Sequence, residues 1–163
     1  MEKPNTLESF ASPVSLRQAT SNDFNFLFGV STEAMRPVVE TLNPEKVFDE
    51  QEGRAKYQEK FKPENIQVIQ YENQDVGRLR VVRSEESIYV GGIQILPEFQ
   101  AKGIGTSIFA ELIQESEKTG LPIILEVHDV NEQAINFYKK LGFTEGEKIK
   151  DQTVMKYTPP NHV

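Results

Sequence analysis

Cysteine and tryptophan are both absent from the 163-residue sequence. Without a thiol the chain forms no disulfide, uses no cysteine nucleophile and offers no thiolate to a metal, which suits a cytoplasmic compartment. No apolar run approaches the roughly 20 residues that a membrane-spanning helix needs. Residues 1–12 also lack the basic and apolar regions of a secretory signal. The sequence therefore predicts a cytoplasmic protein without a membrane partner.

Positive charge is scarce as well. Lysine and arginine number 18 against 25 aspartates and glutamates, so the net charge is −7. This balance argues against nucleic-acid binding, which depends on neutralising phosphates. It favours cationic partners, although net charge governs solubility and encounter rates more directly than substrate identity. We also expect no metal site.

The length and composition fit one globular domain. Hydrophobic residues make up 37% and charged residues 26% of the chain, which lies outside the disordered range. We expect a single domain over residues 1–163 with its core at about 14–158. Short flexible tails are expected at 1–12 and 158–163, where Pro159 and Pro160 stop strand pairing.

The N-terminal part of the chain reads as one strand and two helices. A strand is expected at 14–19, and Thr20 followed by Asp23 has the spacing of a helix-capping box. The apolar stripe that follows has a helical period. Pro37 should break or kink this helix just before the proline. A second helical stretch is expected at about 44–61.

The rest of the chain changes from hairpins to alternating elements. Short turns predict antiparallel strands, and Gly120 and Gly142 stand where helices end on a left-handed residue. The expected elements are strands at 66–71, 76–83 and 87–96, a helix at 105–118, a strand at 123–127, a helix at 132–141 and strands at 143–150 and 153–157. A meander followed by a strand–helix–strand crossover predicts an α/β fold with a mixed sheet and helices on its faces.

The sharpest local signal is the glycine-containing turn at 100–106, between a strand and an amphipathic helix. Gly103 and Gly105 let the backbone turn tightly, and the helix start presents unpaired N–H groups and the positive end of its dipole. Such a turn binds phosphate or pyrophosphate, and Lys102 and Thr106 add a mobile charge and a hydroxyl. The turn alone is equally consistent with a purely structural role.

Two other phosphate-binding motifs do not fit this turn. A P-loop requires Gly-Lys-Ser/Thr after four spacer residues, and the chain contains no such run. A dinucleotide-binding fold requires a third glycine, and this chain has Ile108 at that position. Such a fold also alternates strands and helices from its start, whereas three antiparallel strands precede the turn here.

Two motifs in the right order resemble the GNAT acetyltransferase superfamily. The turn at 100–105 matches the motif Gln/Arg-x-x-Gly-x-Gly/Ala, and the strand at 93–98 ends in Pro-Glu as in the family. Residues 131–138, followed by Leu-Gly-Phe at 141–143, are similar to the signature Asn-x-x-Ala-x-x-Phe/Leu-Tyr…Gly-Phe. The resemblance covers about 87–146.

This resemblance implies a three-layer α/β/α acyltransferase fold with a mixed, splayed sheet. It also implies transfer of the acetyl group of acetyl-CoA to a primary amine by direct attack, without a metal or a covalent enzyme intermediate. The acceptor is a small-molecule amine or a protein N-terminus. A non-catalytic CoA-binding module or sensor of the same fold is the alternative. The expected partners are acetyl-CoA and an amine, and a homodimer is left open.

The resemblance also implies which residues hold acetyl-CoA. The edge of the strand at 93–96 would pair with the pantetheine arm, and the N–H groups at its end would lie near the thioester and stabilise an oxyanion. The implied set is Ile95, Leu96, Gln100, Ala101, Lys102, Gly103, Ile104, Gly105, Thr106, Asn131 and Tyr138. Asn131 is equally a good helix N-cap. Gly91 and Gly92 mark a strand bulge, a close ligand approach or a purely structural need.

Tyr138 matches the tyrosine that acts as general acid in many members of the family. A phenol with a pKa near 10 is protonated at neutral pH and can donate. Its neighbour Phe137 lies about 100° away on a helix, so both side chains cannot face the same way. We expect Phe137 in the core and Tyr138 in the cleft, the reverse being the alternative.

Glu126 is the candidate base, directly or through water. A carboxylate is out of place in the apolar strand at 123–127 unless it faces a cleft or solvent. Ribosomal-protein alanine acetyltransferases of the family show a similar Leu-Glu-Val and use its glutamate as base. His128, on the same strand face, is a second candidate, though a lone histidine is more often incidental. The family's acceptor pocket implicates Phe28, Met35, Arg36 and the stretch 49–52.

Overall fold

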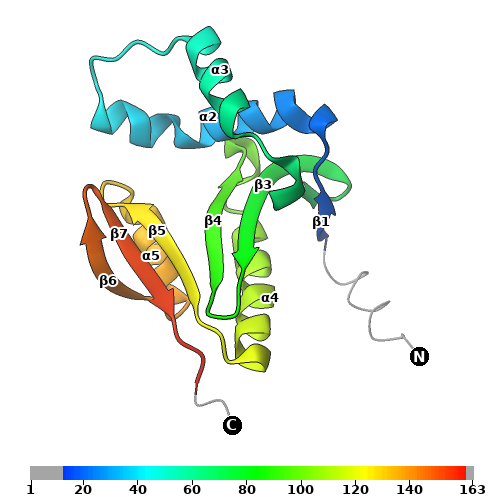
Figure 1. The fold of residues 1–163 in the computed structure, drawn as a ribbon, viewed down its shortest axis with the longest axis vertical. Coiled ribbons are helices and arrows are strands. Elements are labelled where there is room, and N and C mark those ends of the chain that lie inside the picture. Colours follow the sequence, from blue (N-terminus) through cyan, green and yellow to red (C-terminus); the bar gives the residue numbers. More distant parts are fainter. Residues whose placement is uncertain (1–12, 161–163) are drawn as a thin grey trace.

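A seven-stranded mixed sheet forms the centre of the computed structural model, which describes residues 13–160 (Figure 1). The strand order is β1-β2-β3-β4-β5-β7-β6, and only β4 and β5 pair in parallel. The strands are β1 (Val14–Gln18), β2 (Ile66–Tyr71), β3 (Gln74–Arg83), β4 (Ile88–Ile95), β5 (Ile123–His128), β6 (Thr144–Ile149) and β7 (Gln152–Tyr157). The predicted α/β class is confirmed. The expected tail at 1–12 lies outside the described residues, as does the end of the other tail, 161–163.

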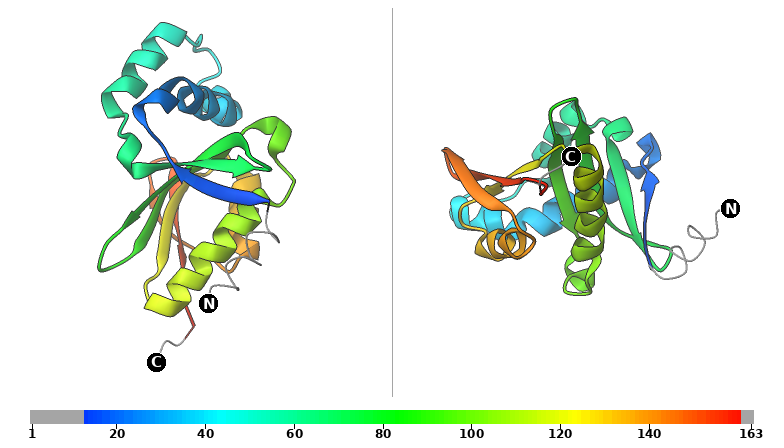
Figure 2. Two further views of the ribbon diagram at one scale, coloured as in Figure 1. Left: turned by 90° about the vertical axis from the view of Figure 1, so that its right-hand side faces the viewer. Right: turned by 90° about the horizontal axis from the view of Figure 1, so that it is seen from below.

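Helices cover both faces of this sheet (Figures 1 and 2). They are α2 (Phe24–Leu42), α3 (Glu50–Lys60), α4 (Ile104–Thr119) and α5 (Glu132–Lys140), with single 3-10 turns η1 (Ser21–Asp23), η2 (Pro63–Asn65) and η3 (Pro97–Phe99). Ile66 and Val68 of β2 pack with Leu27 of α2, whereas Ile69 joins the larger cluster around α4. Because alternate residues of a strand face opposite sides, α2 and α4 lie on opposite faces.

The start of α2 follows the prediction closely. The Thr20 side chain accepts from Asn22 N–H at 3.3 Å, and the Asp23 carboxylate accepts from Thr20 N–H at 2.9 Å, which completes the expected capping box. Arg17 of β1 bonds the same Asp23 at 2.9 Å and Asp75 of β3 at 2.8 Å. The cap therefore ties the first strand, the first helix and the central hairpin together.

Of the break or kink predicted at Pro37, the break is wrong. Helix α2 continues through Pro37 to Leu42, because proline removes one N–H donor but its fixed φ is compatible with a helix. Val38, directly after it, is buried, whereas Pro37 and Val39 are exposed. The second helix also starts later than expected, at Glu50, where the Asp49 side chain accepts from the N–H of Glu52 at 3.2 Å.

The sheet splits between β4 and β5. These strands pair only through Ile88 with Ile123 and Tyr89 with Ile124, and beyond these residues they diverge (Figure 1). The larger hydrophobic core, which includes Phe109 of α4, fills the space behind both halves. The splayed sheet that the resemblance implied is therefore present, and the separation creates room for a ligand between two parallel strands.

Candidate active site

A cleft of about 270 Å³ opens where β4 and β5 separate. Its walls come from β4, β5, the first turns of α5, the start of β7 and one residue of α2. The lining residues are Met35, Tyr89, Val90, Gly91, Gly92, Ile93, Gln94, Leu125, Glu126, Val127, His128, Asn131, Ala134, Tyr138 and Gln152. The cleft therefore gathers Tyr138, Glu126, His128 and Asn131, which the sequence singled out separately.

A β-bulge at Gly91 bends β4 away from β5. Arg80 of β3 pairs with Gly92 and Val81 with Val90, so Gly91 is the extra residue. A Cβ on Gly91 would lie 2.0 Å from the Arg80 guanidinium, and one on Gly92 would lie 3.0 Å from that of Arg78. The glycine pair thus serves a bulge and makes room for two arginine side chains.

The turn after β4 presents an open helix N-terminus. Ala101 and Gly103 have φ values of 63° and 83°, and the first helical bond runs from Ser107 N–H to the carbonyl of Gly103 at 3.0 Å. No side chain caps the helix at Gly103, and a Cβ there would meet no atom within 4 Å. The N–H groups of the first turn therefore face open space, which fits a pyrophosphate.

The second glycine of the motif has a different role from the first. A Cβ on Gly105 would lie 3.4 Å from the ring of Phe137, so Gly105 allows α5 to pack closely against the start of α4. Gln100 anchors the turn to the preceding strand, because its amide donates to the carbonyl of Ile95 at 2.9 Å. Lys102 and Thr106 are both exposed beside the turn.

The end of β4 offers one of the two expected oxyanion donors. Leu96 N–H donates to the carbonyl of Val76 at 2.9 Å, so the sheet already uses it, and the expectation for the Leu96 N–H is wrong. Backbone groups alternate between the two edges of an antiparallel strand. The N–H of Ile95 therefore points to the β5 side, where the strand has no partner among residues 13–160.

Tyr138 is both a cleft residue and a core residue. It is 8% exposed and lines the cleft, while its ring lies 5.4 Å from Phe109 and 5.6 Å from Phe143. Phe137, expected in the core, is only half-buried and covers the start of α4. Burial raises the pKa of Tyr138 to about 12, so the phenol is protonated at neutral pH.

Glu126 is exposed and reaches the cleft from β5. Its Oε1 accepts a hydrogen bond of 2.9 Å from the hydroxyl of Tyr89 on β4. Burial, followed by this hydrogen bond, raises the pKa of Tyr89, which keeps Tyr89 a donor at neutral pH. The pair holds the carboxylate at the mouth of the split between the strands.

The side chains of Asn131 and His128 each make contacts with neighbouring residues of the fold. The Asn131 side-chain oxygen accepts from Ala134 N–H at 3.2 Å and caps α5, which leaves its amide donors. His128 Nε2 lies 3.4 Å from the side chain of Gln152, and Nδ1 lies 3.9 Å from Asp151. Contacts to the start of β7 therefore orient His128.

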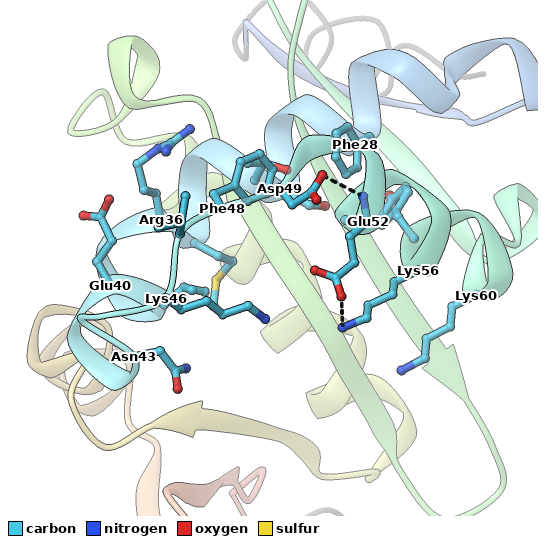
Figure 3. A pocket seen from close by; sticks show the side chains of 17 residues that line it. Phe28, Arg36, Glu40, Asn43, Lys46, Phe48, Asp49, Glu52, Lys56 and Lys60 are labelled. Carbon is cyan, nitrogen blue, oxygen red and sulfur yellow. Dashed lines mark hydrogen bonds and ion pairs between the residues drawn. The ribbon is translucent and has the colours of Figure 1, made fainter.

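A second, larger pocket of about 760 Å³ lies between α2, α3 and the segment joining them (Figure 3). Phe28, Arg36, Asp49 and Glu52, which the sequence suggested for the acceptor, line it, and Met35 lines both this pocket and the cleft. Its other lining residues are Ser31, Thr32, Val39, Glu40, Asn43, Lys46, Val47, Phe48, Gly53, Lys56, Tyr57 and Lys60. The two openings therefore share a wall on α2.

Sequence reasoning missed Tyr89 and Gln94, which line the cleft, and Arg78 and Arg80, whose guanidinium groups lie against the cleft residues Gly92 and Gly91. The available signal was a pair of arginines at alternate positions of one strand, facing a glycine pair on the next. Residues 13–160 contain no helix long and apolar enough to cross a membrane. The same residues hold no cluster of three or more histidine, aspartate or glutamate side chains suited to a metal ion.

Comparison with known sequences places these features in a family. The profile of the acetyltransferase (GNAT) family matches residues 35–143. An uncharacterized N-acetyltransferase, MJ1207, of Methanocaldococcus jannaschii is 37% identical over 70 residues, 42% of this chain and 31% of its own length. The ribosomal protein bS18-alanine N-acetyltransferase of Escherichia coli K12 is 37% identical over 67 residues, 40% of this chain and 44% of its own. The chain thus spans less than half the length of these relatives.

Solved structures share the fold at low sequence identity. The PaiA N-acetyltransferase of Thermoplasma acidophilum, in complex with coenzyme A, has a TM-score of 0.69 at 17% identity over 89% of this chain and 98% of that one. The ribosomal-protein-S18-alanine N-acetyltransferase of Escherichia coli has a TM-score of 0.64 at 18% identity, over 92% and 96%. Together with the family match over most of the chain, these similarities show that the protein belongs to the GNAT family of acetyltransferases.

Proposed function

We propose that this protein transfers the acetyl group of acetyl-CoA to a primary amine. The observation that carries the proposal is the cleft between β4 and β5, which gathers Tyr138 and Glu126 from different elements. The uncapped start of α4 follows β4 through a short turn. A phosphate-binding turn therefore lies directly after β4, and a candidate acid and base lie in the cleft beside the same strand. An acyl-CoA enzyme needs both features.

The residues present fit acetyl-CoA. Backbone N–H groups from Ala101 to Thr106 would hold the pyrophosphate, with the open space at Gly103 leaving room for it. The free edge of β4 near Ile95 would pair with the amides of the pantetheine arm. The Asn131 amide would add a hydrogen bond from the other wall, since only its oxygen is used in capping α5. The similar PaiA N-acetyltransferase of Thermoplasma acidophilum is in complex with coenzyme A.

Two side chains would handle the proton and the developing charge. The thioester of acetyl-CoA supplies an activated acetyl group to a neutral amine, and Glu126 accepts the proton that the ammonium must lose, directly or through water. Tyr138, which lines the cleft, would hydrogen-bond the leaving sulfur. Its pKa of about 12 exceeds the roughly 8.5 of a free thiol, so hydrogen bonding to the developing thiolate contributes more than complete proton transfer.

The acceptor would approach through the side of the cleft that α2 closes. Met35 lines both the cleft and the α2–α3 pocket, so a substrate body in that pocket places its amine near β4 and β5. Of the relatives, the Escherichia coli enzyme is named for acetylating an alanine of ribosomal protein bS18. A small-molecule amine and a protein N-terminus both remain within this proposal.

Calorimetric titration with acetyl-CoA, followed by a thiol-release assay on a panel of amines, tests the proposal. The chain has no cysteine, so the thiol assay carries no protein background. We expect binding that is lost with dephosphorylated pantetheine, and thiol release that depends on an added amine. Binding without amine-dependent release would favour the CoA-binding module. A folded sample that does not bind acetyl-CoA would contradict the whole assignment.

A further inference from the structure

Two arginines beside the cleft lack the carboxylate partner that every other described arginine has. Within residues 13–160, Arg78 and Arg80 of β3 take part in no ion pair. The remaining described arginines all do: Arg17 with Asp23 and Asp75, Arg36 with Glu33, Arg54 with Glu50, and Arg83 with Glu115. In a chain with an excess of acidic residues, two adjacent unpaired guanidinium groups call for an anion from outside the chain.

Arg78 is held in place by neutral groups alone. Its Nη1 donates to the side-chain oxygen of Gln94, a cleft residue, and its Nε is enclosed without an acceptor among the described residues. The hydroxyl of Tyr57, from α3, lies beside this guanidinium and is enclosed without any other partner among the described residues. Burial lowers the pKa of Arg78. A half-buried cation without a counter-ion is costly, so the structure favours an anion beside this guanidinium.

Arg80 lies two residues after Arg78 in β3 and therefore on the same face of the sheet. Leu79, between the two arginines, points into the core around α4, so Arg78 and Arg80 both point away from it. Their guanidinium groups lie over Gly92 and Gly91, which line the cleft. The positive charge of Arg80 also acts on Tyr89, which places it near the pair formed by Tyr89 and Glu126.

Among residues 13–160, the cleft wall next to the arginines holds no carboxylate of its own. Glu126, on the opposite strand, is the only carboxylate that lines the cleft in the described residues, and it already accepts from Tyr89. The two arginines are not among the lining residues, but their guanidinium groups lie against Gly92 and Gly91, which are. The net charge of −7 predicts cationic partners at long range, whereas these two arginines provide positive charge beside the cleft.

We infer that the acceptor amine carries a carboxylate, which Arg78 and Arg80 bind at the edge of the cleft. The inference rests on the proposed acetyl transfer and specifies its substrate class: amino acids or short peptides rather than polyamines. Arginine suits this role because its planar, permanently charged group forms parallel hydrogen bonds to a carboxylate. The same carboxylate would position the amine relative to Glu126.

Matched acceptors test this inference. L-amino acids and dipeptides are each compared with the corresponding C-terminal amide, and kcat/KM is measured by thiol release. We expect the acid to exceed its amide by about 10-fold or more, since a charge-assisted bidentate contact is lost in the amide. In Arg78→Gln and Arg80→Gln the ratio should fall toward 1, mainly through the KM of the acid, and Arg→Lys at either site should retain part of it.

Arg83→Gln provides a matched control on the same strand, because Arg83 pairs with Glu115 away from the cleft. This variant should keep the full preference for the acid. Thermal melting of each variant separates folding from recognition. A purely structural role for Arg78 would lower the melting temperature and reduce the acid and the amide equally, which contradicts the inference.

Further outcomes separate this inference from the proposed function. If the wild-type protein acetylates amides as well as acids, the transferase stands and the carboxylate site is wrong. If Arg78→Gln or Arg80→Gln weakens acetyl-CoA binding without changing the acid-to-amide ratio, the arginines bind the co-substrate and the inference falls. If no amine of either kind releases thiol, both the proposed function and the inference are overturned.

Discussion

The hydroxyl of Tyr89 on β4 donates a 2.9 Å hydrogen bond to Oε1 of Glu126 on β5, and Tyr89 is also the last residue of β4 that pairs with β5, opposite Ile124. The contact bridges the split in the sheet where β4 and β5 begin to diverge. It also gives an exposed carboxylate a preferred orientation. A surface glutamate without such a contact would sample many rotamers, so this bond is the clearest structural argument for Glu126 as base.

Removing the Glu126 carboxylate should slow acetyl transfer. We expect Glu126→Gln to lower kcat/KM by about 10²-fold, the range for loss of a general base, without changing acetyl-CoA affinity in calorimetry. Tyr89→Phe should cost less, because it only frees the carboxylate. The double variant should be no worse than Glu126→Gln alone, since coupled residues are not additive. Additive losses would show that Tyr89 has a separate role.

Tyr138→Phe should lower kcat by about 10²-fold while acetyl-CoA binding changes little. The ring contacts with Phe109 and Phe143 are preserved in phenylalanine, so the melting temperature should stay close to that of the wild type. Phe143→Leu, which disturbs the same aromatic cluster away from the hydroxyl, controls for packing. Unchanged turnover in Tyr138→Phe would remove this hydroxyl from the mechanism.

The raised pKa of Tyr138 predicts a loss of stability at high pH. In the unfolded chain the phenol ionises near its ordinary value of 10, and in the folded protein near 12. Its neutral form therefore stabilises the fold fully below pH 10, and this contribution is lost as pH rises from about 10 through about 12. Denaturant unfolding across this range should show a smaller decline in Tyr138→Phe than in the wild type. Equal declines would contradict the buried phenol.

The two left-handed glycines at the ends of α4 allow a matched comparison. Gly103 has a φ of 83° and Gly120 a φ of 80°, so valine at either site imposes similar backbone strain, about 1–2 kcal/mol. Only Gly103→Val should weaken acetyl-CoA binding, by about 10-fold or more, because its side chain enters the open space before the helix N-terminus. Equal affinities in the two variants would remove the phosphate site from this turn.

Arg17 should stabilise the protein near neutral pH more than in acid. Hydrogen bonds from its guanidinium lower the pKa of both Asp23 and Asp75 below the ordinary 3.8. A carboxylate with a lowered folded pKa contributes stability above its unfolded pKa, and this is lost as pH falls through the folded value. Arg17→Gln should therefore cost about 1 kcal/mol at pH 7, allowing for solvent screening, and much less at pH 3. Denaturant titrations at both pH values measure the difference.

Local patterns predicted most of the secondary structure. The capping box at Thr20, the left-handed residues at Gly120 and Gly142, and the order of strands after residue 66 are all as expected. These features depend on neighbouring residues, so they can be read from short windows of sequence. Pro37 misled the prediction because its fixed φ is compatible with a helix, so α2 continues through it to Leu42.

The paired motifs predicted the fold family and the place of the cleft, but not its acceptor side. Tyr138, Glu126, His128 and Asn131 are far enough apart in sequence that only folding shows them lining one opening. The Leu96 N–H looked equivalent to that of Ile95 until strand pairing assigned it to Val76. Which edge of a strand is free depends on register, and register depends on the whole sheet.

The sequence by itself determined the class of protein, because glycine turns, helix caps and alternation are local and follow from backbone sterics and hydrogen bonding. Only the tertiary structure decided what surrounds each charge. Arg78 and Arg80 read as ordinary strand residues in an acidic chain, and their lack of carboxylate partners appears only once β3, β4 and α3 pack together. The energy of a charge depends on its burial and its neighbours in space, neither of which adjacent sequence specifies.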